Sequence, residues 1–232
     1  MAKRKRKKTP MPHWPIAVVI VIAIGAALWF GRAHLGKLQL PTIANAPAGV
    51  LSVDAAHVDS ANDGRRVRVT GMLTADGPAR DAQVGISANA ALLLRHVEMF
   101  AWREHCSGAA CSYDTGWGVP ADSRKFREPK GHENPPAPFA SAQFVAPGLK
   151  LGAFGIDPDL LTAQRAPQAY PVTDAGLAPN MAASFSADNG VLYAGGDPAY
   201  PQVGMLRVNY RVVQLGAAAL EGVQRGTLIK AN

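Results

Sequence analysis

Two cysteines and a histidine near the middle of the chain allow two kinds of chemistry. Cys106 and Cys111 are the two cysteines of the sequence, and His105 directly precedes the first. Two cysteines this close are expected to form a disulfide in an oxidising compartment. As thiolates they could instead join His105 in binding a metal, but a closed zinc site needs a fourth ligand, and the sequence has no second Cys or His cluster. We therefore predict a structural disulfide between Cys106 and Cys111 and no metal.

A second polar cluster, His132-Glu133-Asn134-Pro135, lies within a proline-rich and charged stretch over 120–147. An asparagine before a proline is typical of a turn, so this stretch is predicted to be a long surface loop. We identify His132 and Asn134 as candidate interaction residues. The alternative is a binding or catalytic cleft beside His132, which would require a carboxylate or thiol within hydrogen-bond reach of that side chain.

The sequence contains none of the common catalytic motifs: no nucleophile elbow, zinc-protease helix, phosphate-binding loop or dinucleotide fingerprint. Glu98 and Glu104 could suggest a pair of catalytic carboxylates. Six residues of extended strand would separate them by about 20 Å, too far for the roughly 5 to 9.5 Å of glycosidase pairs. We predict no catalytic residues and no cofactor, which favours a protein that is not an enzyme.

The N-terminal region indicates on which side of a membrane the rest of the chain lies. Residues 14–31 are apolar, with Trp14 near one end and Trp29 near the other, which is typical of a transmembrane helix. Six consecutive basic residues at 3–8 precede it, so the positive-inside rule predicts that residues 1–13 form a cytoplasmic tail. A cleaved signal peptide is the alternative, although the apolar stretch is long for one and Arg32 follows it. Both interpretations export the rest of the chain.

The charge distribution argues against a nucleic-acid partner. The formal net charge is +7, from 24 Lys and Arg against 17 Asp and Glu. Without the six basic residues at 3–8, 18 basic residues remain against 17 acidic ones, a balance of +1. The exported part is nearly neutral and has no basic stripe interleaved with aromatic residues.

Hydrophobic periodicity predicts a β-rich α+β domain with a mainly antiparallel sheet and short helices. Residues 32–50 are expected to be a linker, 51–215 the domain and 216–232 a C-terminal tail. We expect strands over 65–72, 97–102, 112–119, 149–156, 185–194 and 205–213, short helices over 53–61, 87–94 and 157–162, and a polar loop over 74–85. Arg66, Arg68, Arg207 and Arg211 would form either a basic sheet face that meets lipid headgroups or a solvated face.

Several strings of residues resemble the LUMA family of membrane proteins. They lie over 62–71, 84–90, 94–102, 113–117, 123–126, 132–135, 151–154 and 197–208, and include Val97-Glu98-Met99-Phe100-Ala101-Trp102. The resemblance covers about residues 50–215. It implies an N-terminal membrane helix, a large extracytoplasmic domain and further C-terminal membrane helices. It also implies, for animal members, residence in the inner nuclear membrane and endoplasmic reticulum with lamins and emerin, and no catalytic residue set.

No further membrane-length apolar run follows the domain before Asn232. The expectation is therefore either a single-pass member or a sequence that lacks the C-terminal helices. We expect a single-pass protein of a cell inner membrane that acts as a scaffold or in envelope organisation, with the lipid bilayer and membrane or envelope proteins as partners. Self-association into a homo-oligomer is left open. The alternative is a periplasmic enzyme or small-ligand-binding protein with its site near His132.

Overall fold

The computed structural model describes residues 49–174, 177 and 179–231, all within one compact unit over 45–232. The predicted cytoplasmic tail, membrane helix and nearly all of the linker lie outside the described residues. In the described part, no helix is both long and apolar enough to cross a bilayer. The fold is β-rich, as the sequence predicts, and most of its strand pairs are antiparallel.

The strands are β1 Leu51–Asp54, β2 Arg66–Thr74, β3 Ala79–Asp81, β4 Ile86–Ala88, β5 Leu92–Ser107, β6 Ala110–Gly118, β7 Ala142–Val145, β8 Lys150–Leu151, β9 Phe154–Ile156, β10 Gln168–Tyr170, β11 Phe185–Asp188, β12 Val191–Ala194, β13 Leu206–Val213, β14 Gly216–Arg225 and β15 Leu228–Lys230. The helices are the 3-10 helices η1 Ser60–Asn62 and η2 Ser123–Lys125 and the α-helices α2 Pro158–Gln164 and α3 Pro179–Ala182.

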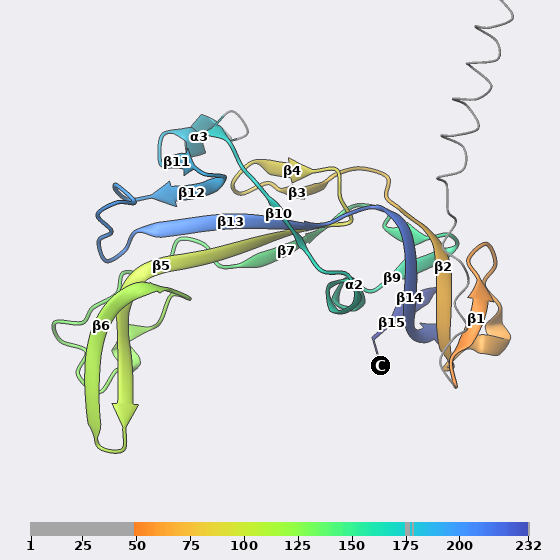
Figure 1. Cartoon of the computed structure of the whole chain (residues 1–232), viewed down its shortest axis with the longest axis horizontal. Helices are drawn as coiled ribbons and strands as arrows, with labels where there is room; N and C mark the ends of the chain where they lie inside the picture. The colour runs from red at the N-terminus through yellow and green to blue at the C-terminus, as the bar shows by residue number, and fades with distance from the viewer. Residues whose placement is uncertain (1–48, 175–176, 178, 232) are drawn as a thin grey trace, which may run out of the picture. The chain divides into compact units, whose positions relative to one another are not determined.

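The first sheet has six strands in the order β1-β2-β14-β15-β9-β8, and β8 also pairs with β2 (Figure 1). The pairing path therefore returns to β2 and closes a ring of strands. Inward-facing Val67, Val69, Leu151, Phe154 and Leu220 are fully buried in its core. Helix α2 adds the buried Leu160 and Leu161 to the same core.

The second sheet has seven strands: β11-β12-β13-β5-β6, with β10 on β13 and β7 on β5. Alternating residues of β5, among them Val97, Met99 and Ala101, are buried in its core, while Glu98 and Phe100 are half-buried on the opposite face. This confirms the strand expected over 97–102.

A buried charged network holds the β3–β4 hairpin over this second core. Asp81 accepts hydrogen bonds from Arg95 Nη1 and from the Tyr210 hydroxyl, both at 2.7 Å. Arg95 also donates to Gln83 Oε1 at 3.0 Å. Burial, followed by the neighbouring carboxylate, raises the pKa of Tyr210 far above its usual range. The charged groups are almost fully enclosed but satisfied by one another, which is the condition for retaining them in a core.

Several local expectations were wrong. Residues 87–94, expected to be helical, form the end of β4 and the start of β5, because Leu92 faces the first core and Leu93 the second. The helix expected over 53–61 is β1 followed by η1, and the loop expected over 74–85 contains β3. The tail expected over 216–232 contains β14 and β15, which lie within the six-stranded sheet.

Of the two alternatives considered for the four arginines, the single basic sheet face does not form. Arg66 and Arg68 lie on β2 in the first sheet, whereas Arg207 and Arg211 lie on β13 in the second. Arg68 pairs with a glutamate of β14, and Arg207 pairs with a glutamate of β5 at 2.6 Å. The positive charges are thus divided between two sheets and partly neutralised.

Candidate interaction site on the arm

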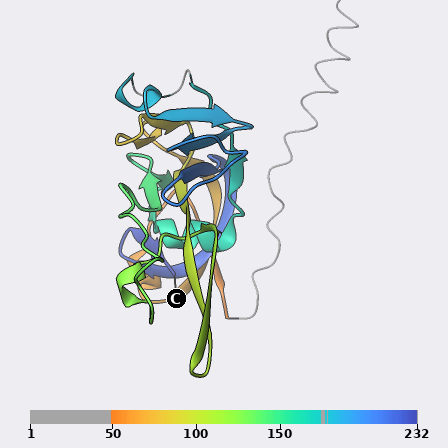
Figure 2. The same cartoon turned by 90° about the vertical axis from the view of Figure 1, so that its left-hand side faces the viewer.

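Strand β5 is longer than its partner β13, and the excess builds an arm. Met99 of β5 pairs with Leu206, the first residue of β13. Beyond that point β5 pairs with β6, down to Ser107 and Ala110 at the turn. Figure 2 shows this hairpin extending beyond the other strands of its sheet. We call residues 100–118 the arm.

A disulfide joins Cys106 to Cys111 near the tip of the arm, as their spacing predicts. The two residues are direct cross-strand partners, and Gly108 in the turn has a φ of 62°, which a residue without a side chain adopts readily. The covalent bond fixes which residues of β5 and β6 face each other. Glu104 is thereby placed opposite Tyr113, and Trp102 opposite Thr115.

Asn134 fastens the long loop to the arm. Its side-chain oxygen accepts a hydrogen bond from Trp102 N at 2.7 Å, and its side-chain nitrogen donates to Trp102 O at 3.0 Å. The amide therefore bonds to β5 as a neighbouring strand would. The backbone nitrogen of Asn134 donates to Ser123 Oγ at 2.8 Å, which ties η2 to the same point.

His132 is packed between two aromatic rings of the arm. Its ring stacks on Tyr113, with centroids 3.8 Å apart, and meets Trp102 edge to face at 4.8 Å. Its Nδ1 lies 2.9 Å from the carbonyl oxygen of Glu128. The contacts of this histidine are those of a packing residue.

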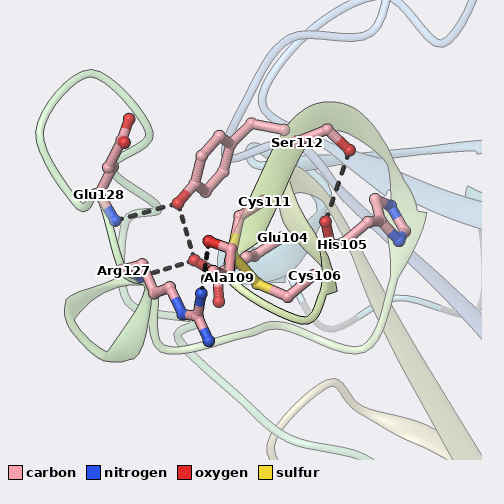
Figure 3. Close-up of a disulfide and its surroundings, with 9 residues drawn as sticks. Glu104, His105, Cys106, Ala109, Cys111, Ser112, Arg127 and Glu128 are labelled. Carbon is pink, nitrogen blue, oxygen red and sulfur yellow. Dashed lines mark hydrogen bonds between the residues drawn. A yellow bond between two sulfur atoms is a disulfide. The ribbon is translucent and has the colours of Figure 1, made fainter.

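Glu104 holds the segment before His132 against the arm (Figure 3). Its Oε1 accepts from the Tyr113 hydroxyl at 2.8 Å and from Arg127 N at 2.6 Å. The bond from Arg127 N, and then that from Tyr113, lower the pKa of Glu104. Arg127 Nη1 donates to Ala109 O at 2.8 Å, and Glu128 N donates to the Tyr113 hydroxyl at 3.0 Å. The loop and the arm are thus joined at several points.

The metal alternative considered from sequence does not assemble. His105 points to the other face of the arm, where its Nε2 lies 3.2 Å from Asp114 Oδ1. Glu104, Cys106 and Cys111 do come together, with one ligand atom of each within 4.8 Å of the others. Cysteine binds metal as a thiolate, so the oxidised pair does not fit an ion.

The alternative considered from sequence is a cleft beside His132, whereas the structure has a cavity beside Asn134. A cavity of about 470 Å³ is lined by Pro120, Ala121, Asp122, Ser123, Arg124, Asn134, Pro135, Pro136 and Ala137. Its charged residues, Asp122 and Arg124, bond to each other at 2.8 Å. His132 is not among its lining residues. The two candidate residues of the loop therefore lie in different surroundings: Asn134 lines the cavity, and His132 packs against the arm.

Sequence reasoning did not identify Glu104 and Tyr113 as partners, although a signal for them exists. Once Cys106 and Cys111 are paired, the antiparallel register assigns every other pair of the hairpin. Glu104 then falls opposite Tyr113, and a carboxylate opposite a phenol is a hydrogen-bonding pair. Arg127, more than a dozen residues beyond the hairpin turn, carries no comparable signal.

Comparison with known proteins places the chain in a family of membrane proteins. Residues 102–231 match the profile of the family described as Transmembrane protein 43, and the chain belongs to that family. This confirms the resemblance seen in the sequence. All of the arm beyond its first two residues, its loop, α2 and strands β13 to β15 lie within the matched residues.

The chain is 29% identical to Transmembrane protein 43 of Rattus norvegicus over 184 residues, covering 72% of this chain and 45% of that protein. It is 28% identical to Transmembrane protein 43 of Homo sapiens over 176 residues, covering 69% of this chain and 43% of that protein. It therefore spans less than half the length of these curated relatives. No solved structure matches it.

Proposed function

We propose that this protein is a non-enzymatic, single-pass inner-membrane protein whose exported domain organises other membrane or envelope proteins by direct contact. The observation that carries the proposal is the disulfide in an accessible arm of a chain that begins with basic residues and an apolar stretch. Disulfides persist in oxidising compartments outside the cytoplasm. The basic residues that precede the apolar stretch favour an orientation with the N-terminus in the cytoplasm and the domain outside it.

The construction of the arm supports contact over catalysis. His132 is occupied by stacking and Asn134 by the β5 backbone, so the two candidate residues serve to shape the surface. Exposed polar residues of the arm, such as Ser112 and His105, then form a surface that a partner can bind without rearrangement. Such preorganisation lowers the entropic cost of association.

A second candidate function is binding of a small ligand in the cavity beside Asn134. The enclosing prolines and the Asp122–Arg124 pair would favour a compact, partly polar molecule. This candidate predicts that the ligand protects the purified domain against thermal unfolding. A protein partner that contacts the arm would not compete with the ligand for this cavity.

The orientation is tested with a phosphatase that becomes active only outside the cytoplasm. Fused after Ala231 it should be active, and fused after residue 13 it should be inactive. Activity in the opposite order would refute the proposed topology.

The contact role is tested by photo-crosslinking in the native membrane. A photoreactive residue at Ser112, exposed on the arm, should form adducts with other membrane or envelope proteins. The matched control carries the probe at Met72, which is 57% exposed on the six-stranded sheet. Equal adducts at both positions, or none at Ser112, would contradict a role for the arm.

A further inference from the structure

The arm leaves one backbone edge open. In antiparallel pairs, residues with closely spaced Cα atoms direct their backbone N–H and C=O groups away from the partner strand. The Cα atoms of Cys106 and Cys111 are 4.1 Å apart, so they form such a pair. Every second residue of β6 from there, namely Tyr113, Thr115 and Trp117, therefore presents its backbone groups to the outer side of β6.

The outer edge of β5 is closed by contrast. Phe100 N donates to Met205 O at 2.8 Å, and Phe100 O accepts from Gly204 N at 2.9 Å. Trp102 is bonded through both backbone groups to the side chain of Asn134. Within residues 49–174, 177 and 179–231, no hydrogen bond reaches the outward backbone groups of Tyr113, Thr115 or Trp117.

Strand β6 carries few of the features that protect edge strands. From Ala110 to Gly118 it has no proline or lysine and one charged residue, Asp114. The two large rings lean over β5, because Tyr113 bonds Glu104 and Trp117 meets Phe100 edge to face at 5.6 Å. These two ring contacts therefore lie on the β5 side of β6.

We propose that β6 pairs with β6 of a second copy of this chain, antiparallel and with the two-fold axis at Thr115. The Thr115 residues of the two copies then form a hydrogen-bonded pair, and Tyr113 of each copy faces Trp117 of the other. Threonine pairs and aromatic pairs are among the favourable cross-strand neighbours. The second sheets of the two copies are then joined through their β6 strands into one continuous sheet.

Charge complementarity selects this register. Asp114 faces Gly116 of the second copy, and the guanidinium of Arg103 covers Gly116 so closely that a Cβ there would lie 2.6 Å from Arg103 Cζ. Each Asp114, already bonded to its own Arg103 at 3.0 Å, thus approaches the Arg103 of the other copy. An axis at Asp114 would instead oppose two carboxylates directly, which is destabilising.

A register shifted toward the tip is also disfavoured. An axis at Tyr113 would bring Ala109 into the pairing, but the carbonyl of Ala109 already accepts from Arg127 Nη1. This inference rests on the strand edge alone and does not depend on the proposed function.

The experiment uses the full chain in its native membrane, with single cysteine additions. Thr115→Cys should yield, on mild oxidation, a dimer linked 115 to 115, identified by mass spectrometry and lost on reduction. The control is Tyr200→Cys, which is 77% exposed and lies outside the arm. Equal dimer at both positions, or no 115 to 115 linkage, would overturn the proposal.

A second pair of variants separates edge pairing from other routes to a dimer. Thr115→Pro removes an N–H that points outward, so the fold of one copy is retained while pairing between copies is weakened by at least about tenfold. Thr115→Ala keeps that N–H and should keep the dimer. Both are checked for native circular dichroism and then sized by light scattering in detergent. Undiminished dimer in Thr115→Pro would show that another surface holds the copies together and would refute the inference.

Discussion

Replacing Asn134 by alanine tests whether one side chain joins the loop to the arm. The substitution removes the hydrogen bonds of 2.7 and 3.0 Å to the backbone of Trp102 and a longer one of 3.3 Å to Ala121 O. Each hydrogen bond contributes about 0.5 to 1.5 kcal/mol. Because the site is half-buried and water can replace part of what is lost, we expect a destabilisation of about 2 kcal/mol.

The assay is thermal and urea unfolding of the purified chain followed by circular dichroism. For a domain of this size, a destabilisation of 1 kcal/mol lowers Tm by roughly 2 to 4 °C, so Asn134→Ala should lower it by about 4 to 8 °C. Amide exchange should also accelerate at Trp102, whose N–H loses its acceptor.

The matched control is Asn209→Ala. Asn209 is half-buried on β13, and its side chain makes no hydrogen bond to the rest of the described chain. Its loss should change stability by less than about 0.5 kcal/mol. Equal effects of the two substitutions would refute the assignment of Asn134 as the fastening residue.

Three other perturbations have directions fixed by the structure. Cys106→Ser combined with Cys111→Ser opens a small ring and should lower the free energy of unfolding by about 2 kcal/mol in urea titrations. The double variant should be as stable as the reduced wild type. A difference in stability between these two proteins would mean that the serines act by another route. Asp81→Asn leaves buried Arg95 without its counter-charge and should cost about 3 to 5 kcal/mol in chemical denaturation, where a cost below 1 kcal/mol would contradict the network. Glu98 has a pKa lowered chiefly by the hydrogen bond from its arginine partner on β13. Its stabilising contribution is therefore present above the unfolded pKa of about 4.3 and lost as pH falls toward the folded value, so wild type should lose about 1 kcal/mol more than Glu98→Gln between pH 6 and pH 3.

Strands with one buried face and one more solvent-exposed face could be predicted from the sequence, and β2 and β13 are examples. Strand β14 was missed because small apolar residues occupy both of its faces, Ala218 and Leu220 on one and Ala217 and Ala219 on the other. Residues 87–94 contain good helix formers, yet consecutive Leu92 and Leu93 serve two different cores. An extended chain directs neighbours to opposite sides, whereas a helix does not. Tertiary burial outweighed local propensity there.

The site divides in the same way. The disulfide was predictable because its two cysteines are close in sequence and paired by the same hairpin. The bond between Asn134 and Trp102 joins residues 32 positions apart, and that between Tyr210 and Asp81 joins residues 129 positions apart. Neither contact leaves a periodic trace, because each depends on where separate elements meet in space.

The order of strands in the six-stranded sheet bears on how the chain folds. Strand β2 pairs along its length with β14, where Val69 faces Leu220 about 150 positions later, and contacts of such long range slow folding. Until β14 and β15 arrive, β2 has an unpaired edge and an uncovered row of valines. Because the N-terminal strands are synthesised first, this incomplete sheet is exposed to incorrect pairing and aggregation until β14 and β15 are made. Chaperones that bind extended segments would act on the chain at that stage.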